Sequence, residues 1–201
     1  MIGRRFSIVV ATDEAGGIGK DGAIPWNFPG DMRWFRYITT RTKDPEKFNA
    51  VIMGRNTWES LPPKYRPLPR RINIVISSTM DMGGPDAEPV IVMGTLEEAL
   101  RNIPYSVENV FVIGGAMLYG AALQNIRCEY VYWSFIPGVY DCDTFFPEMP
   151  EAWLGDVARF QDGRHVYRFA ATAAPKSQAP WEWEGAGSTL LALNPTSATR
   201  L

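Results

Sequence analysis

The sequence predicts a single α/β domain with a central, mostly parallel sheet, flanking helices and an antiparallel hairpin at its C-terminal end. Three observations favour this class. Short strand-like runs alternate with helical segments, several runs are apolar throughout, and a turn signal separates two strand-like runs near residue 162. The chain has 201 residues, 46% of them hydrophobic, which is enough to bury a substantial core.

Short runs of Val, Ile, Phe or Tyr bounded by turn residues predict the strands. In chain order these runs are residues 6–11, 50–53, 72–77, 90–93, 110–113 and 130–136. The runs at 50–53, 90–93 and 110–113 are apolar throughout, which is typical of strands buried on both faces of a parallel sheet.

Helical segments separate these strands. They are predicted over residues 32–40, after Arg55, from Thr95 onward and over residues 116–123. The third begins with a capping box, in which Thr95 is the N-cap and Glu98 stands at the third helical position.

The C-terminal part of the chain changes character twice. Residues 153–160 and 164–171 flank the turn signal Gln-Asp-Gly, which predicts an antiparallel hairpin. After residue 171 the composition shifts to Ala, Pro, Ser and Thr, so we expect a domain over 1–171 and a tail over 172–201. Trp181 and Trp183 are candidates for docking that tail, and both a native terminus and a cut linker are compatible with the sequence.

Charge and residue usage exclude several classes of protein. A net charge of -2 argues against a nucleic-acid-binding surface. No apolar run approaches the ~18 residues of a membrane span, and the run after Arg5 is too short for a signal peptide. Two cysteines without metal-type spacing and a single histidine, His165, predict no metal site, and the cysteine usage fits a cytoplasmic protein.

The segment Gly17-Ile-Gly-Lys-Asp-Gly22 matches the GxGxxG pattern of dinucleotide-binding sites only in its letters. That fingerprint requires a helix at its end to receive a pyrophosphate. Here Ile24-Pro25-Trp26 follows, and proline keeps the residue before it extended. We therefore predict a mobile Gly-rich loop (residues 17–22) that closes over a site and excludes water.

Two other glycine-containing turns, residues 53–57 and 113–116, each join a strand end to a helix start. Free backbone N–H groups at helix starts attract anions, and glycine permits close approach of the backbone. Each turn alone is compatible with an ordinary strand-to-helix connection, but at neighbouring strands the two can hold a diphosphate between them. Arg55 adds a permanent cation suited to a further phosphate.

One carboxylate stands among aromatic residues in the segment 25–35. Asp31 lies at a helix start, and Phe35 follows one turn later on the same helix face. An acid in a first turn is ordinarily a cap, but apolar neighbours such as Trp26 and Met32 predict burial and a raised pKa. A carboxylate in such a pocket can bind the edge of an amino-substituted heterocycle through two parallel hydrogen bonds.

Six segments carry a family resemblance. They are residues 17–19 (Gly-Ile-Gly), 24–32 (Ile-Pro-Trp-Asn-Phe-Pro-Gly-Asp-Met), 51–62 (Val-Ile-Met-Gly-Arg-Asn-Thr-Trp-Glu-Ser-Leu-Pro), 66–77 (Arg-Pro-Leu-Pro-Arg-Arg-Ile-Asn-Ile-Val-Ile-Ser), 111–119 (Phe-Val-Ile-Gly-Gly-Ala-Met-Leu-Tyr) and 142–147 (Cys-Asp-Thr-Phe-Phe-Pro). In this order, within residues 6–171, they resemble dihydrofolate reductase. The resemblance implies that family's fold and an oxidoreductase that transfers a hydride from NADPH to dihydrofolate, giving tetrahydrofolate for one-carbon and thymidylate metabolism.

The resemblance also implies roles on the substrate side. Asp31 would bind the pterin, and a water admitted by the Gly-rich loop and supported by Trp26 and Ser134 would protonate N5. Arg71, rather than the adjacent Arg70, would bind the α-carboxylate of the glutamate tail. The walls around the substrate would come from Val9, Val10, Met32, Phe35, Leu61, Leu68 and Ile113.

On the cofactor side, the resemblance implies that Tyr119, also counted as catalytic, lies by the nicotinamide and its ribose. Their other neighbours would be Ala11, Ile18, Thr57 and Ile113. The remaining cofactor contacts would come from Gly54, Arg55, Asn56, Ser77, Ser78, Gly114, Gly115, Ala116, Met117 and Leu118. The Gly114–Gly115 peptide bond would be cis.

Some residues depart from parts of the family. The acid is Asp31, as in bacterial and protozoan members, whereas vertebrate members have Glu, and residues 62–66 look like a eukaryotic insert. Ser78 stands where animal members often have Arg, which leaves Arg55 and the serines to favour NADPH. We expect a cytoplasmic monomer, and the resemblance leaves room for a covalent or functional link to thymidylate synthase.

Two alternatives remain at this stage. A reductase of the same fold could act on a pyrimidine intermediate of riboflavin synthesis, but that alternative predicts loss of the Trp26, Asp31 and Phe35 cluster, and all three residues are present. A protein that binds folate or nicotinamide nucleotides without turnover is the other alternative, since binding does not prove catalysis.

Overall fold

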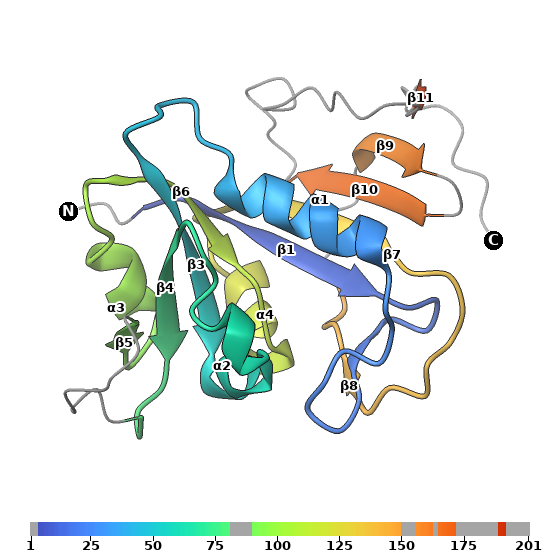
Figure 1. Ribbon diagram of the computed structural model, residues 1–201, viewed down its shortest axis with the longest axis horizontal. Helices are drawn as coiled ribbons and strands as arrows, with labels where there is room; N and C mark the ends of the chain where they lie inside the picture. The colour runs from blue at the N-terminus through green and yellow to red at the C-terminus, as the bar shows by residue number, and fades with distance from the viewer. Residues whose placement is uncertain (1–3, 81–89, 150–155, 163–164, 172–188, 192–201) are drawn as a thin grey trace.

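A computed structural model of the chain shows a twisted sheet covered by helices (Figure 1). It describes residues 4–80, 90–149, 156–162, 165–171 and 189–191, with side chains up to residue 149. The main sheet has nine strands in the order β11-β9-β10-β7-β1-β6-β3-β4-β5. The predicted α/β class is therefore confirmed.

The parallel part of the sheet contains the strands predicted from the apolar runs. They are β7 (Cys128–Phe135), β1 (Phe6–Thr12), β6 (Val107–Val112), β3 (Phe48–Gly54), β4 (Arg71–Ile76) and β5 (Ile91–Met93). Each pairs in parallel with its neighbours in that order. Every predicted run overlaps its strand, with boundaries that differ by at most three residues.

The predicted hairpin closes this sheet on the β7 side. β9 (Asp156–Asp162) and β10 (His165–Ala171) pair antiparallel, and β10 also pairs antiparallel with β7. Within the range assigned to the tail, β11 (Thr189–Leu191) pairs with β9. Residues 153–155 of the predicted hairpin, and Trp181 and Trp183, lie outside the described residues.

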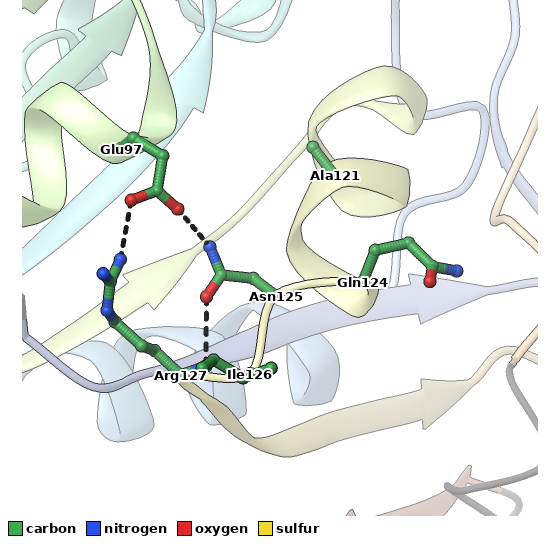
Figure 2. A pocket seen from close by; sticks show the side chains of 6 residues that line it. All are labelled: Glu97, Ala121, Gln124, Asn125, Ile126 and Arg127. Atoms are coloured by element: carbon green, nitrogen blue, oxygen red, sulfur yellow. Dashed lines mark hydrogen bonds and ion pairs between the residues drawn. The ribbon is translucent and has the colours of Figure 1, made fainter.

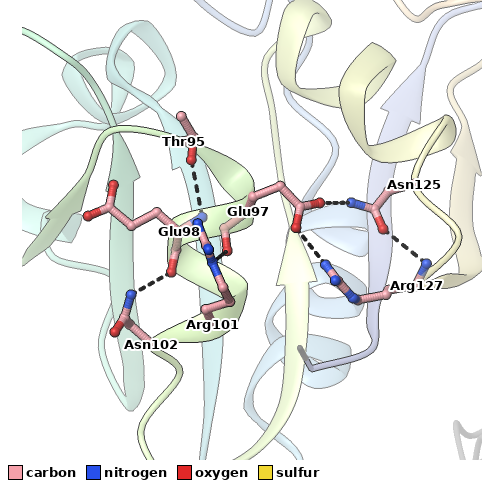
Figure 3. Close-up of polar contacts among 7 residues, drawn as sticks. All are labelled: Thr95, Glu97, Glu98, Arg101, Asn102, Asn125 and Arg127. Atoms are coloured by element: carbon pink, nitrogen blue, oxygen red, sulfur yellow. Dashed lines mark hydrogen bonds and ion pairs between the residues drawn. The ribbon is translucent and has the colours of Figure 1, made fainter. Parts of the chain in front are cut away.

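All four predicted helices are present. They are α1 (Pro29–Thr40), α2 (Arg55–Ser60), α3 (Leu96–Arg101) and α4 (Ala116–Leu123), with a 3-10 turn at Pro63–Tyr65. α1 begins three residues earlier than predicted because Pro29 is tolerated at a first helical position. The predicted capping box caps α3, where Thr95 Oγ1 accepts a hydrogen bond from Glu98 N at 3.1 Å (Figure 3).

Alternation along β1 shows how the core divides into two layers. Ile8 and Val10 pack with α3 and α4 on one face of the sheet, whereas Val9 packs with α1 and α2 on the other. Successive side chains of a strand point to opposite faces, so each central strand supplies both layers. The α1 layer consists of Val9, Trp34, Ile38, Val51, Met53, Trp58, Leu68, Val75, Phe111 and Tyr132.

The Gly-rich loop begins with a short strand that the sequence did not predict. β2 (Gly17–Gly19) pairs antiparallel with β8 (Thr144–Phe145), and Lys20 forms an isolated bridge with Ala23. The next helix begins only at Pro29, which confirms that the segment is not a dinucleotide-binding fingerprint. None of the described helices combines the length and apolar character that a membrane crossing requires.

Candidate active site

The structure brings the two glycine-containing turns together, as predicted. β3 and β6 are neighbours, and each runs directly into a helix, α2 or α4. The turns are joined by hydrogen bonds, because Gly54 N donates to Gly114 O at 2.8 Å and Ile113 N donates to Ile52 O at 2.9 Å. The peptide bond between Gly114 and Gly115 is cis.

The second turn lies close to α2, and a Cβ added at Gly114 would be in tight contact with Thr57. A Cβ built on Gly114 would lie 3.2 Å from Thr57 Oγ1 and 3.6 Å from Tyr119 Oη, and φ at Gly114 is +132°. A Cβ on Gly115 would lie 3.4 Å from the same hydroxyl. The turns therefore present bare backbone beside a hydroxyl group, which suits a bound anion.

We expect Gly114→Ala to destabilise the protein by about 1–3 kcal/mol, because it combines an unfavourable φ with a tight contact to Thr57. Thermal unfolding measures this loss. Gly120→Ala, in α4, is the matched control, since its Cβ meets nothing closer than 3.8 Å and alanine is the better helix former. Equal melting temperatures for the two variants would contradict the crowding argument.

Tyr119 connects this turn to the centre of the sheet and to α1. Its side chain is buried in α4, and its hydroxyl donates to Val9 O at 2.9 Å. Burial, and then the negative charge of the Asp31 carboxylate, raise the pKa of Tyr119, so the phenol stays neutral and keeps its proton. The Tyr119 hydroxyl therefore bonds the backbone of β1 at Val9, near enough to Asp31 to be affected by its charge.

Asp31 lies in the first turn of α1 and is only 7% exposed. Phe28 occupies the N-cap position of that helix, so Asp31 is not the N-cap, and the positive end of the helix dipole favours its negative charge. The structure thus places one buried carboxylate on the α1 side of the sheet, as the aromatic neighbours predicted.

Trp26 carries a buried polar group for which the described part of the chain supplies no partner. The side chain is buried, and its Nε1 has no hydrogen-bond acceptor among the described residues. The indole packs edge to face on Tyr140, with ring centroids 5.5 Å apart. A buried donor without an acceptor is costly, so Trp26 Nε1 suits a water molecule or a ligand atom.

Most predicted wall residues lie in or against the α1 layer. Val9 and Leu68 are part of it, and Phe35, Leu61 and Ile113 pack against it. Met32, one residue after Asp31, is 52% exposed.

The structure does not bring the Val10 side chain to this wall. Val10 packs with Ile8 in the layer beneath α3 and α4, on the opposite face of the sheet. Adjacent strand residues cannot point to one face, so Val9 and Val10 cannot both line the wall with their side chains.

Arg71 opens β4 and packs its guanidinium over the ring of Phe35, 5.6 Å from the ring centroid. Its Nη1 donates to Thr39 Oγ1 at 2.8 Å and its Nε donates to Pro69 O at 3.1 Å. Burial, and then the charge of Arg36, lower the pKa of Arg71 to about 10, which still leaves it cationic at neutral pH.

No carboxylate among the described residues forms an ion pair with Arg71, whose hydrogen bonds go to a hydroxyl and a carbonyl group. The neighbouring Arg70 is exposed and has a φ of +62°. Arg71 is therefore the arginine that can receive an anionic group beside Phe35.

Arg55 is the first residue of α2 and reaches the turn that follows β4. Its Nε donates to Glu59 Oε1 at 2.6 Å, and its Nη1 donates to Thr79 Oγ1 at 3.1 Å. Ser77 Oγ accepts hydrogen bonds from the backbone N–H groups of Thr79 and Met80, while Ser78 is exposed. The predicted cation and the two predicted serines thus share one surface.

The other predicted cofactor residues differ in accessibility. Asn56 is exposed at the start of α2, and Met117 is 92% exposed on α4. Ile18 and Leu118 pack against the α4 layer. Ala11 and Ala116 are partly exposed, at the end of β1 and the start of α4. Ser134 is 3% exposed on β7, in register with Ala11.

A surface pocket of about 350 Å³ lies elsewhere and contains none of the predicted residues (Figure 2). It is lined by Glu97, Ala121, Gln124, Asn125, Ile126 and Arg127. The Glu97 carboxylate in this pocket already has two partners. It accepts hydrogen bonds from Arg127 Nη1 and Asn125 Nδ2, both at 2.7 Å (Figures 2 and 3). These contacts tie α3 to the turn after α4.

Sequence reasoning missed Asp13, which follows β1 and is 2% exposed. Its carboxylate joins the Gly-rich loop to residues 140–142. The only signal in the sequence is an Asp shortly before Gly16-Gly17, a pattern typical of side-chain turns.

Comparisons with known proteins identify the family of this chain. Residues 5–172 match the family model described as dihydrofolate reductase. A bifunctional dihydrofolate reductase-thymidylate synthase from Zea mays is 44% identical over 149 residues, which are 72% of this chain and 29% of that protein. A dihydrofolate reductase from Heliothis virescens is 39% identical over 148 residues, which are 72% of this chain and 80% of the relative.

A dihydrofolate reductase from Drosophila melanogaster is 39% identical over 151 residues, covering 74% of this chain and 82% of the relative. The chain thus spans less than a third of the length of the plant proteins and most of the length of the insect proteins. With the family model matched over most of its length, this chain belongs to the dihydrofolate reductase family.

Proposed function

We propose that this protein reduces dihydrofolate to tetrahydrofolate with NADPH as the hydride donor. One observation carries the proposal. Asp31, Phe35 and Thr39 follow one another at four-residue intervals on α1, and Arg71 is bound to Thr39. The helix rise separates Asp31 from Thr39 by roughly 12 Å. An acid, an aromatic face and a cation in a line match a ligand with an amino-heterocycle, an aromatic ring and a carboxylate tail.

The residues present also suit a nicotinamide dinucleotide. The bare backbone of Gly54, Gly114 and Gly115 can receive a diphosphate, Thr57 can donate its hydroxyl, and Arg55 can bind a phosphate on the ribose. When bound, NADPH supplies the hydride. The chain contributes orientation, since two flat rings must stack in register and water must be kept away.

Proton supply is the task of the α1 side. Asp31 binds the pterin edge through paired hydrogen bonds and holds it in place. Trp26 Nε1, which lacks an acceptor among the described residues, orients the water that delivers a proton to N5, and Ser134 supports the same water. The Gly-rich loop covers the site and limits access of further water.

The test is NADPH oxidation by the purified protein with dihydrofolate, with and without methotrexate, and with NADH in parallel. Rapid oxidation that methotrexate inhibits would support the proposal. Binding of dihydrofolate and NADPH without oxidation would favour a binding protein. If dihydrofolate does not bind, the substrate is wrong, and a pyrimidine ring becomes the next candidate.

Arg55→Leu is expected to raise the KM for NADPH about tenfold and to leave the KM for NADH nearly unchanged, because one charge-assisted contact to a phosphate is lost. Steady-state kinetics with both cofactors measure this. Arg33→Leu, an exposed arginine of α1, is the control and should change neither constant. If the KM rose equally for NADPH and NADH, Arg55 would contribute to the binding of both cofactors and not to the choice between them.

We also propose that the protein acts as a cytoplasmic monomer, with a covalent or functional link to thymidylate synthase. The plant relatives are bifunctional dihydrofolate reductase-thymidylate synthases by name, which supports the link. The mass of the native protein in a cell extract tests it. A single species of about 22.5 kDa, with no larger form, would contradict a covalent link.

A further inference from the structure

The Asp13 side chain accepts four hydrogen bonds. Its Oδ1 accepts from Gly17 N at 2.7 Å and from Ala15 N at 2.9 Å. Its Oδ2 accepts from Tyr140 N at 3.0 Å and from the free thiol of Cys142 at 3.7 Å. The two oxygens thus serve two segments, the entry to the Gly-rich loop and residues 140–142.

These two segments are packed with no space between them. A Cβ on Gly17 would lie 2.4 Å from Cys142 Cβ and 2.5 Å from its Sγ. Real Cβ atoms do not approach so closely, so only glycine fits here. Next to this contact, Gly17 pairs with Phe145 in the β2–β8 ladder. The position of the Gly-rich loop is therefore set against residues 140–145.

Tyr140 extends this arrangement to the candidate active site. Its backbone N–H is bound by Asp13, and its hydroxyl donates to Pro137 O at 3.1 Å. Its ring packs edge to face on Trp26, whose Nε1 lacks an acceptor among the described residues. Asp13 thus contacts Gly17 directly and reaches Trp26 through a single intervening residue.

The charge state of Asp13 suits this role. Burial alone would raise its pKa, but the backbone N–H groups of Tyr140, Gly17 and Ala15 and the Cys142 thiol outweigh burial and lower the pKa of Asp13 below its ordinary value. At neutral pH the group is a carboxylate, which only accepts hydrogen bonds. Neither an amide nor a hydroxyl can replace it without placing a donor against a donor or losing an oxygen.

We propose that Asp13 is a positioning residue for the reaction, which sets the Gly-rich loop through Gly17 and the indole of Trp26 through Tyr140. The inference rests on the proposed function for its kinetic part only. Asp13 itself touches neither reacting ring. If it served stability alone, its loss would lower the melting temperature and the folded fraction without changing the turnover of the molecules that remain folded.

The central variant is Asp13→Asn, which keeps the size of the side chain. The amide oxygen can still accept from one segment, but its NH2 group then faces the N–H donors of the other. Asp44→Asn is the matched control, because Asp44 also accepts a backbone N–H, from Glu46 at 3.0 Å, in a loop that contains no predicted site residue. Tyr140→Leu is the second variant, which removes the ring beside Trp26 and keeps the backbone N–H bound by Asp13.

The first measurement does not depend on activity. Amide hydrogen exchange at Ala15, Gly17 or Tyr140 should become at least about tenfold faster in Asp13→Asn, as expected for the loss of a hydrogen bond to a charged group. Exchange at Ile52 and Val112, in the buried strands, should not change. Trypsin cleavage after Lys20, in the Gly-rich loop, should also accelerate. Unchanged exchange at all three amides would overturn the proposal whatever the turnover.

The second measurement is the split between kcat and KM. Asp13→Asn should lower kcat about tenfold, per folded molecule as counted by methotrexate titration, with the KM for dihydrofolate within about twofold. Tyr140→Leu should lower kcat without faster exchange at Ala15 and Gly17. Faster exchange in Asp13→Asn with an unchanged kcat would overturn the positioning role. If the unaltered protein does not reduce dihydrofolate, the proposed function fails, and the exchange measurement still decides whether Asp13 holds the two segments.

Discussion

Replacing Asp31 by Asn should reduce the turnover of dihydrofolate at pH 7 by about 10²- to 10⁴-fold, because the pterin is no longer held where the water can protonate N5. Asp31 is the buried carboxylate of α1, and its charge acts as far as Tyr119. Asparagine keeps the size of the side chain but replaces one acceptor oxygen with a donor, so the paired hydrogen bonds to an amino-heterocycle edge cannot form. Steady-state kinetics at several pH values measure the change.

Two further results belong to the same variant. The Kd for NADPH, measured by protein fluorescence, should change less than about twofold. Asp31 is not part of the glycine turns that would hold the dinucleotide. Turnover should recover in part at acidic pH, where dihydrofolate takes up the proton from bulk solvent and depends less on being held beside the water in the site. Asp44→Asn serves again as the control. A variant as active as the parent at pH 7 would remove Asp31 from the mechanism.

The parts of the fold that the sequence predicted are those encoded by local signals. The apolar runs at 50–53 and 110–113 became β3 and β6 because strands covered on both faces must be apolar throughout. α4 has the predicted bounds because it follows a glycine N-cap directly. The capping box at Thr95 works through residues three apart, so it is visible in the sequence itself.

The parts that were missed depend on residues far apart in the chain. β2 and β8 are three and two residues long, too short to show alternation, and they pair across more than 120 residues. The contacts of Asp13 are equally hard to predict from the sequence, because its partners Tyr140 and Cys142 lie 127 and 129 positions away. Their contacts with Asp13 exist only in the folded chain.

Val10 was a different error. The family resemblance implied wall roles for both Val9 and Val10, and the alternation of side chains within a strand already separates two adjacent residues. The structure places them in the two opposite core layers. A side-chain role implied by a family resemblance therefore holds only where the geometry of this chain allows the side chain to reach the site.

Arg71→Leu should raise the KM for dihydrofolate on the order of ten- to a hundredfold, because a charge-assisted, paired hydrogen bond to a carboxylate contributes about 1.5–3 kcal/mol. The guanidinium is fixed between Thr39 and Phe35 with no carboxylate partner among the described residues, so little reorganisation is needed to receive one. For a dihydropterin without the glutamate tail, the KM should change less than about twofold, since that substrate never contacts the arginine.

The adjacent Arg70 provides the control for Arg71. It carries the same charge one residue away, but it is exposed and does not pack on Phe35, so Arg70→Leu should change neither KM appreciably. A general electrostatic attraction of the anionic substrate would instead make the two variants alike and both effects sensitive to salt. A rise of equal size for both substrates in Arg71→Leu would mean that the variant disturbs the Phe35 wall rather than a carboxylate contact. A fixed cation at the end of the α1 face predicts a rise in KM only in Arg71→Leu, and only for the substrate that carries the glutamate tail.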